Sequence, residues 1–129
     1  MAVVVDVTTL FDGATAASTT CVNLPTGANG LDALNARAAR LGVPGPRLNN
    51  SGLLCAIDGV PKAPDCGENG PDGYEYWGYY HGGTSWNFAS TGPASKKLTN
   101  KSVEGWAFQN GSNGGEPRTS AKFATLTAG

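Results

Sequence analysis

The chain has 129 residues, of which 40% are hydrophobic and 15% are charged, and its formal net charge is −1. This length is expected to give one domain with a single modest core. The nine Lys and Arg residues are scattered, so no basic stripe for nucleic acid is present. No apolar run reaches the roughly 18 residues that a transmembrane segment needs, and MAVVV lacks the charged start of a signal peptide. We therefore expect no nucleic-acid partner, no transmembrane segment and no signal peptide within this chain.

The composition favours a protein that works outside the cytosol. Nineteen glycines, eight prolines and few charges indicate a loop-rich, β-leaning domain. Cys55 and Cys66 flank a proline-rich loop that a disulfide could close, and such bonds persist in oxidising compartments. We predict a Cys55–Cys66 disulfide and a secreted or cell-surface location, with a signal peptide removed before Met1. Cys21 is interpreted as a small buried residue on a strand.

The first part of the chain predicts a hairpin followed by a helix. AVVVDVTTL (2–10) is apolar enough to be a central strand buried on both faces, FDGATAAS is the expected turn, and residues 19–24 form a second strand. A helix is expected at about 29–41, with Asn29 as its N-cap and Gly42 at its end. Its apolar face is a stripe of Leu31, Leu34, Ala38 and Leu41.

The second part of the chain is expected to be mostly strands. The predicted elements are a Pro/Gly-rich connection before a short strand at 53–59, a long Pro/Gly-rich loop without regular structure at 60–73, and strands at 74–81, 85–90 and 102–109. KFATLTA, near the C-terminus, is expected to add an edge strand or to fray. We divide the chain into a single domain at 1–110 and a loosely ordered extension or edge strand at 111–129.

This order of elements predicts an α+β fold. A hairpin, one helix and further strands are the order of a β-grasp-like mixed sheet packed on a helix. The apolar stripe of the helix is what such a sheet would cover.

Four short motifs also resemble a known family. They are LDAL after Gly30, GLLCAIDGV at 52–60, YWGYYHGG with Trp86, and VEGW at 103–106 after Gly92. Together they resemble the small extracellular domains related to the C-terminal β-domain of transcobalamin, over about residues 2–110. The resemblance implies a β-grasp module of secreted or surface-anchored bacterial proteins. In transcobalamin and intrinsic factor the similar domain covers one face of cobalamin, so a corrinoid is the most specific ligand that the resemblance implies.

The aromatic stretch YEYWGYYHGG at 74–83 is the strongest candidate for a binding surface. Alternation along a strand places Tyr76, Gly78 and Tyr80 on one face, and Trp77 and Tyr79 on the other. If the second face packs on the helix, the first shows two rings beside a glycine. Such a shelf suits a planar or ring-shaped ligand. The alternative is that cross-strand aromatic neighbours pair with these rings and simply stabilise the sheet.

Three further residues belong to this candidate site. His81, the only histidine, could face a ligand or ligate a metal through one ring nitrogen, although a surface histidine at a hairpin end is the commoner role. Trp86 could extend the aromatic surface or pair with the rings of the neighbouring strand. Trp106 could extend that surface or the core. The predicted ligand contacts are therefore Tyr76, Tyr80, His81, Trp86 and Trp106, and we predict no metal site and no cofactor.

Catalysis has little support in the sequence. No G-x-S-x-G motif is present, and two of the three cysteines are predicted to pair with each other. We expect a non-catalytic module that binds a small ligand, with a corrinoid as the most specific candidate. The alternative is a structural or adhesive surface domain that binds a protein or glycan partner.

Overall fold

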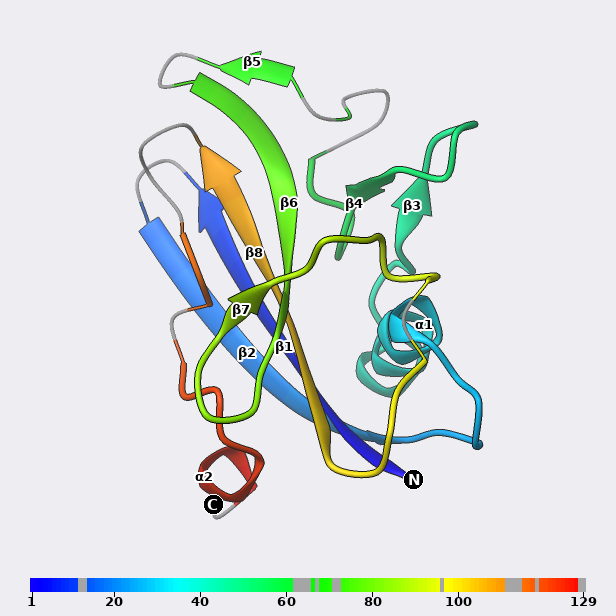
Figure 1. Ribbon diagram of the computed structural model, residues 1–129. Helices are drawn as coiled ribbons and strands as arrows, with labels where there is room; N and C mark the ends of the chain where they lie inside the picture. Colours follow the sequence, from blue (N-terminus) through cyan, green and yellow to red (C-terminus); the bar gives the residue numbers. More distant parts are fainter. Residues whose placement is uncertain are drawn as a thin grey trace.

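A mixed β-sheet packed against one long helix forms the fold (Figure 1). The computed structural model describes residues 1–11, 14–61, 66, 68–70, 73–95, 97–110, 115–117 and 119–127. The sheet has the strand order β2 (Ala14–Asn23), β1 (Ala2–Phe11), β8 (Ser102–Asn110), β6 (Gly73–His81) and β5 (Glu68–Gly70), and β7 (Asn87–Phe88) also pairs with β6. Strands β1 and β8 are parallel and the other pairs are antiparallel. The predicted α+β class is therefore confirmed.

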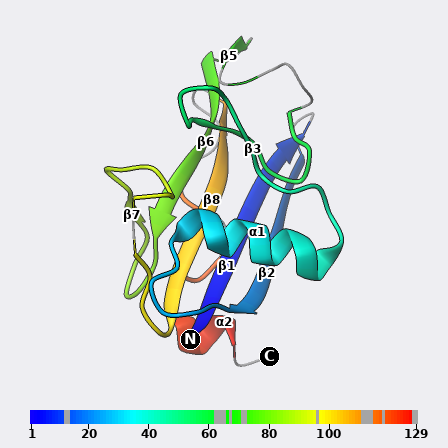
Figure 2. The same cartoon turned by 90° about the vertical axis from the view of Figure 1, so that its right-hand side faces the viewer.

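Strand β1 is buried on both faces, as its apolar sequence predicts. Val3, Val5 and Val7 lie in the cluster beneath helix α1 (Gly30–Leu41), and Val4 lies in a second cluster on the opposite face. Figure 2 shows α1 crossing the sheet in front of β1 and β2. The hairpin of β1 and β2 is also as predicted. Strand β2 begins at Ala14 and not at residue 19, so most of the expected turn FDGATAAS belongs to the strand.

Helix α1 begins and ends where the sequence indicates. The Asn29 side chain accepts from the Asp32 N–H, the Asp32 carboxylate accepts from the Asn29 N–H, and Gly42 ends the helix with a φ of 68°. The buried face is narrower than the predicted stripe, because Leu41 is 44% exposed. Arg37 is buried instead, and its guanidinium forms two hydrogen bonds of 2.6 and 3.0 Å with the Asp58 carboxylate.

Two expectations for the connecting segments and the expectation that Cys21 is buried were wrong. The Pro/Gly-rich connection after the helix contains β3 (Arg47–Leu48), which pairs with β4 (Leu54–Ala56) in a separate two-stranded sheet. The loop at 60–73 contains β5, which lengthens the sheet beyond β6. Cys21 is exposed on β2 and has a free thiol. Short elements of two or three residues leave little periodicity in a sequence, which is why pattern analysis missed β3 and β5.

The C-terminal segment covers the face of the sheet opposite α1. Thr119 O accepts from Trp86 Nε1 at 2.9 Å, and Ala121 O accepts from the Gly83 N–H at 2.9 Å. KFATLTA forms the short helix α2 (Phe123–Leu126) instead of an edge strand, and α2 lies at the same end of the sheet as the N-terminus (Figures 1 and 2). Ala121 of this segment belongs to the second cluster. The cluster comprises Val4, Tyr80, Trp86, Val103, Ala107 and Ala121.

Asp6 is a buried carboxyl on this second face. Its Oδ1 accepts from the Thr19 hydroxyl at 2.7 Å, and the Thr119 hydroxyl lies close enough to the carboxyl to act on it as a donor. Loss of solvation raises the pKa of Asp6 above 3.8, and the Thr19 and Thr119 hydroxyls and the Arg37 charge oppose this rise only in part.

We therefore predict that Asp6→Asn stabilises the protein at neutral pH by about 1 to 2 kcal/mol, because an amide removes the buried charge and can still accept from Thr19. The pKa of Asp6 is higher in the folded protein than in the unfolded chain. At a pH between these two values, the folded protein therefore holds a proton that the unfolded chain has lost. The wild type should therefore lose stability relative to the variant as the pH rises above 3.8 through the folded-state pKa. Urea unfolding of both proteins at a series of pH values measures this difference. A variant less stable than wild type at neutral pH would contradict the prediction.

Candidate functional site

An apolar groove lies where the edge of β6 meets the β3–β4 turn. It has a volume of about 210 Å³, and its walls come from the β3–β4 turn, β6 and the segment 88–93. Strand β5 pairs with Gly73–Glu75 and β7 pairs with Tyr80–His81, so the groove lies along the stretch of β6 between these two pairings. Its lining residues all lack charge: Gly52, Leu53, Leu54, Tyr76, Trp77, Tyr79, Phe88, Ala89, Thr91, Gly92, Pro93 and Trp106.

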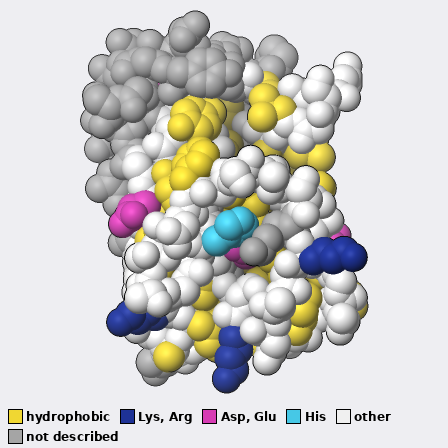
Figure 3. Space-filling model, viewed as in Figure 1, with side chains coloured by type: hydrophobic (Ala, Val, Ile, Leu, Met, Phe, Trp, Pro, Cys, Tyr) yellow, Lys and Arg dark blue, Asp and Glu magenta, His cyan; other side chains and the backbone are white. Residues whose placement is uncertain are grey.

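Three exposed hydrophobic residues border the groove, and two of them, Tyr76 and Phe88, do so from the Tyr80 side of β6, where the Phe88 ring packs edge-on against Tyr80. Leu53 is 52% exposed, Tyr76 38% and Phe88 60%. These are three of the five large hydrophobic residues that are exposed in the described part of the chain. Figure 3 shows hydrophobic side chains gathered on this face over β6, above the single histidine. Clustered exposed apolar residues around a hollow are typical of a binding surface.

The floor of the groove is held in place by the aromatic core. The Tyr79 and Trp106 rings are stacked, with centroids 4.6 Å apart, and the Trp77 ring packs edge-on against Phe108 at 5.3 Å. Trp77 Nε1 donates to Val60 O at 2.9 Å, which ties the residues after β4 to the sheet. The floor is therefore fixed by packing before any ligand arrives.

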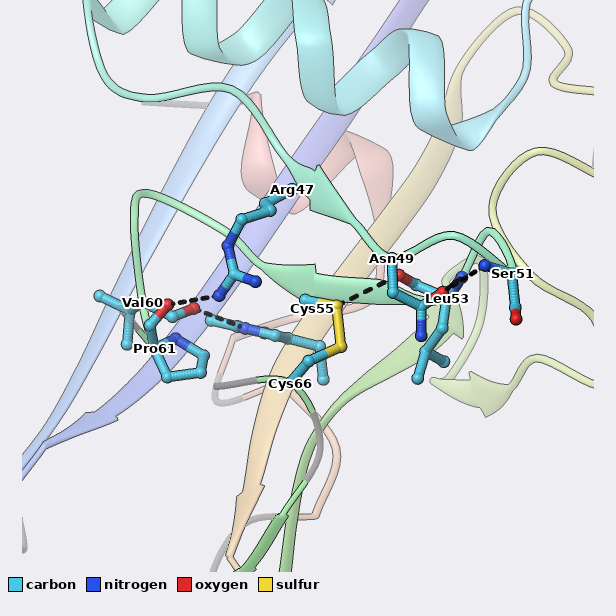
Figure 4. Close-up of a disulfide and its surroundings, with 9 residues drawn as sticks. Arg47, Asn49, Ser51, Leu53, Cys55, Val60, Pro61 and Cys66 are labelled. Atoms are coloured by element: carbon cyan, nitrogen blue, oxygen red, sulfur yellow. Dashed lines mark hydrogen bonds between the residues drawn. A yellow bond between two sulfur atoms is a disulfide. The ribbon is translucent and has the colours of Figure 1, made fainter. Parts of the chain in front are cut away.

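A disulfide holds the β4 side of the groove. Cys55 on β4 is bonded to Cys66, the pairing that the sequence favours (Figure 4). Nearby, Arg47 donates to Pro61 O at 3.0 Å, and the Asn49 carboxamide oxygen accepts from the Leu53 N–H at 2.9 Å. These bonds fix the turn that presents the exposed Leu53 side chain.

The structure separates the five predicted ligand contacts. Tyr76 lies on the rim of the groove, but Tyr80 and Trp86 are only 8% exposed, in the cluster covered by the C-terminal segment. Trp106 is fully buried and its ring packs in the core at the groove floor, which is one of the two roles that the sequence left open. His81 lines a different cavity, with Lys97 and Glu104.

The predicted open shelf at Gly78 is also absent. A Cβ atom on Gly78 would lie 2.9 Å from Gln109 Nε2, so the Gln109 side chain already covers this glycine. Gln109 in turn bonds Gly115 through both ends of its amide, at 2.7 Å each. The alternation of faces in β6 is as predicted; what the sequence did not reveal is that the chain's own C-terminal residues cover the Tyr80 face.

Two groove residues were missed by pattern analysis. Phe88 and Leu53 are exposed hydrophobic residues in segments expected to be strands, and β7 has only two residues. The one available signal was that Leu53 and Phe88 lie next to turn sequences, where a large apolar side chain has no core to enter.

Metal or membrane features are not found in the described ranges. No group of three or more His, Cys, Asp or Glu side chains that could hold a metal lies among residues 1–11, 14–61, 66, 68–70, 73–95, 97–110, 115–117 and 119–127. Within the same residues, no helix is long and apolar enough to cross a membrane.

Comparison with known proteins adds one partial match. The family model of the SCO2322-like domain matches residues 69–129, which is less than half of the chain. This segment contains β6, β7, β8 and α2 and excludes α1 and the hairpin of β1 and β2. No curated protein and no solved structure matches the chain. The chain is thus an α+β domain that is similar to the SCO2322-like domain over its C-terminal part.

Proposed function

We propose that the protein is a non-catalytic module, secreted or displayed at the cell surface, that binds an uncharged ring-shaped ligand in the apolar groove. The observation that supports this most is the groove itself, which has exposed Leu53, Tyr76 and Phe88 on its rim and a packed aromatic floor. Stacking on such rings uses contact area and demands few polar partners. The Cys55–Cys66 disulfide supports the extracellular location, because such bonds persist in oxidising compartments.

The size of the groove limits the ligand. A volume of about 210 Å³ is below the range of about 300–1,000 Å³ typical of pockets for drug-sized molecules. One planar ring, such as a sugar or an aromatic headgroup, fits this space. A corrinoid, which the motif resemblance implies, would enter only with an edge or a side group and would leave most of its macrocycle outside.

The test is a tryptophan-fluorescence titration with cobalamin, cobinamide and a panel of monosaccharides and disaccharides. Trp77 and Trp106 both line the groove, so a bound ring should change their emission at a defined stoichiometry. Tyr76→Ala and Phe88→Ala should each weaken binding about tenfold, because an aromatic contact of this kind contributes roughly 0.5–1.5 kcal/mol beyond the area it buries. Leu41→Ala, at an exposed hydrophobic position on α1 outside the groove, is the matched control and should bind as wild type.

A saturable signal that both rim variants weaken and the control preserves would support the groove. No signal with any small ring, together with binding to a polymeric glycan or a partner protein that Phe88→Ala weakens, would overturn this proposal. It would favour the adhesive alternative.

A further inference from the structure

A second cavity, separate from the groove in its chemistry, lies at the end of β6 and β8. It has a volume of about 400 Å³ and lies between the residues that follow β6, the segment 97–102 and α2. Its lining is mostly polar: His81, Gly82, Gly83, Lys97, Thr99, Lys101, Ser102, Val103, Glu104 and Phe123. The ligand proposed for the groove is uncharged, whereas the lining of this cavity contains the charged residues Lys97, Lys101 and Glu104.

A buried carboxylate forms the inner wall. Glu104 is 2% exposed and lies directly across from His81 in the pairing of β6 and β8. Its Oε1 accepts from the Tyr79 hydroxyl at 2.9 Å, and its Oε2 is 2.7 Å from His81 Nδ1. Burial, followed by the Glu104 charge and its hydrogen bond, raises the pKa of Tyr79 far above its usual value, so this hydroxyl stays protonated and donates.

These contacts fix the histidine in one orientation. The Nδ1–H of His81 points to Glu104, and its ring also packs edge-on against Tyr79, with centroids 4.8 Å apart. Nε2 makes no hydrogen bond within the described part of the chain, and the His81 side chain is 25% exposed. A histidine ring that carries both protons donates from both nitrogens, so with Nδ1 at Glu104 the Nε2–H is the donor left for a ligand.

Two lysines supply positive charge to the same cavity. Lys101 has a φ of 68° in the turn before β8, and its N–H donates to Ala2 O at 2.7 Å. The backbone of Lys97 pairs with that of Asn29, at the start of α1, in an isolated antiparallel β-bridge. The backbone of both is therefore anchored. Glu104 is the single acidic residue among the described lining residues, and both of its oxygens already face donors.

We propose that this cavity is a binding site for a small oxyanion, a carboxylate or a phosphate, held by His81 Nε2–H and by the charges of Lys97 and Lys101. Three donors surround one hollow, and the single acidic residue among its described lining residues already faces Tyr79 and His81, an arrangement that favours an anion over a metal ion. Tyr79 connects the two sites, because its ring lines the apolar groove and its hydroxyl bonds Glu104 in the anion cavity.

The single histidine makes the test direct, since its ring proton signals in NMR belong to one residue. The full chain is titrated with inorganic phosphate and, separately, with succinate, at constant ionic strength set with sodium chloride. Saturable shifts of the His81 ring signals with either probe are expected, and the preferred probe distinguishes phosphate from carboxylate ligands.

Two variants and a control make the result specific. Lys97→Ala with Lys101→Ala should weaken binding about fivefold to tenfold, since each partly solvated ionic contact contributes up to about 1 kcal/mol. His81→Gln, followed through backbone amide signals of residues 97–102, should weaken the binding of both probes, because the Nε2–H donor is lost. Lys122→Ala, an exposed lysine outside the cavity, should bind as wild type.

Shifts that grow linearly without saturation, or equal affinity for the double lysine variant and the control, would overturn the proposal. The outcome is independent of the groove, because neither probe has a ring and no lining residue of the groove is changed.

Discussion

Replacing Trp106 with alanine is expected to lower the free energy of unfolding by about 3 to 5 kcal/mol, the usual cost of deleting a fully buried tryptophan. Trp106 has no exposed surface, stacks on Tyr79 and belongs to the cluster beneath α1. Its removal would leave a cavity between the sheet and the helix that surrounding side chains can fill only in part. Urea unfolding followed by circular dichroism measures the loss.

Phe88→Ala is the matched aromatic control for this experiment. Phe88 is 60% exposed and touches Tyr80 edge-on with centroids 5.2 Å apart, so its loss should cost about 1 kcal/mol or less. If Trp106→Ala does not fold, Trp106→Phe should show a smaller loss in the free energy of unfolding, measured in the same way. Equal losses for Trp106→Ala and Phe88→Ala would contradict the assignment of Trp106 to the core and of Phe88 to the surface.

Removing the disulfide by Cys55→Ser with Cys66→Ser is the second large effect that we expect. The two cysteines are 11 positions apart, and a crosslink over a loop of this length stabilises a protein by about 2 to 3 kcal/mol, mainly by restricting the unfolded chain. Cys55 is 2% exposed on β4, so the bond also holds one wall of the groove. The double variant should unfold at a lower urea concentration and bind groove ligands more weakly.

Cys21→Ser is the control for the disulfide variant, because the Cys21 thiol is exposed and free. We expect its stability to stay within about 0.5 kcal/mol of wild type. A double serine variant as stable as wild type would contradict a structural role for the disulfide. It would also remove one argument for an extracellular location.

The helix and the faces of the sheet could be predicted from the sequence because local chemistry determines them. Asn29 and Asp32 form both halves of the capping box, and Gly42 adopts the left-handed conformation that ends the helix. Alternation along β6 places Trp77 and Tyr79 under α1 and Tyr80 on the other face, as expected. Each of these inferences depends on neighbours within a few residues.

The covering of the Tyr80 face could not be predicted, because it depends on residues far apart in the sequence. Trp86 donates to Thr119 O across 33 positions, and no local pattern in the C-terminal segment indicates which face of the sheet it covers. The anion cavity did leave a signal. Glu104 shares a strand face with Trp106 and Phe108, and a carboxylate on a buried face requires a partner, which His81 and Tyr79 supply.

The location of the binding site is tested most directly by mapping backbone amide shifts of ¹⁵N-labelled protein in the presence of a ring ligand found in the fluorescence panel. If the apolar groove binds the ring, the largest saturable shifts will fall on Leu53, Tyr76, Phe88 and Ala89, and the amides of Trp86 and Ala121 will stay nearly unchanged. Shifts concentrated at Trp86 and Ala121 would contradict the groove as the site, and would mean that the ligand displaces the C-terminal segment to reach the buried Tyr80 face.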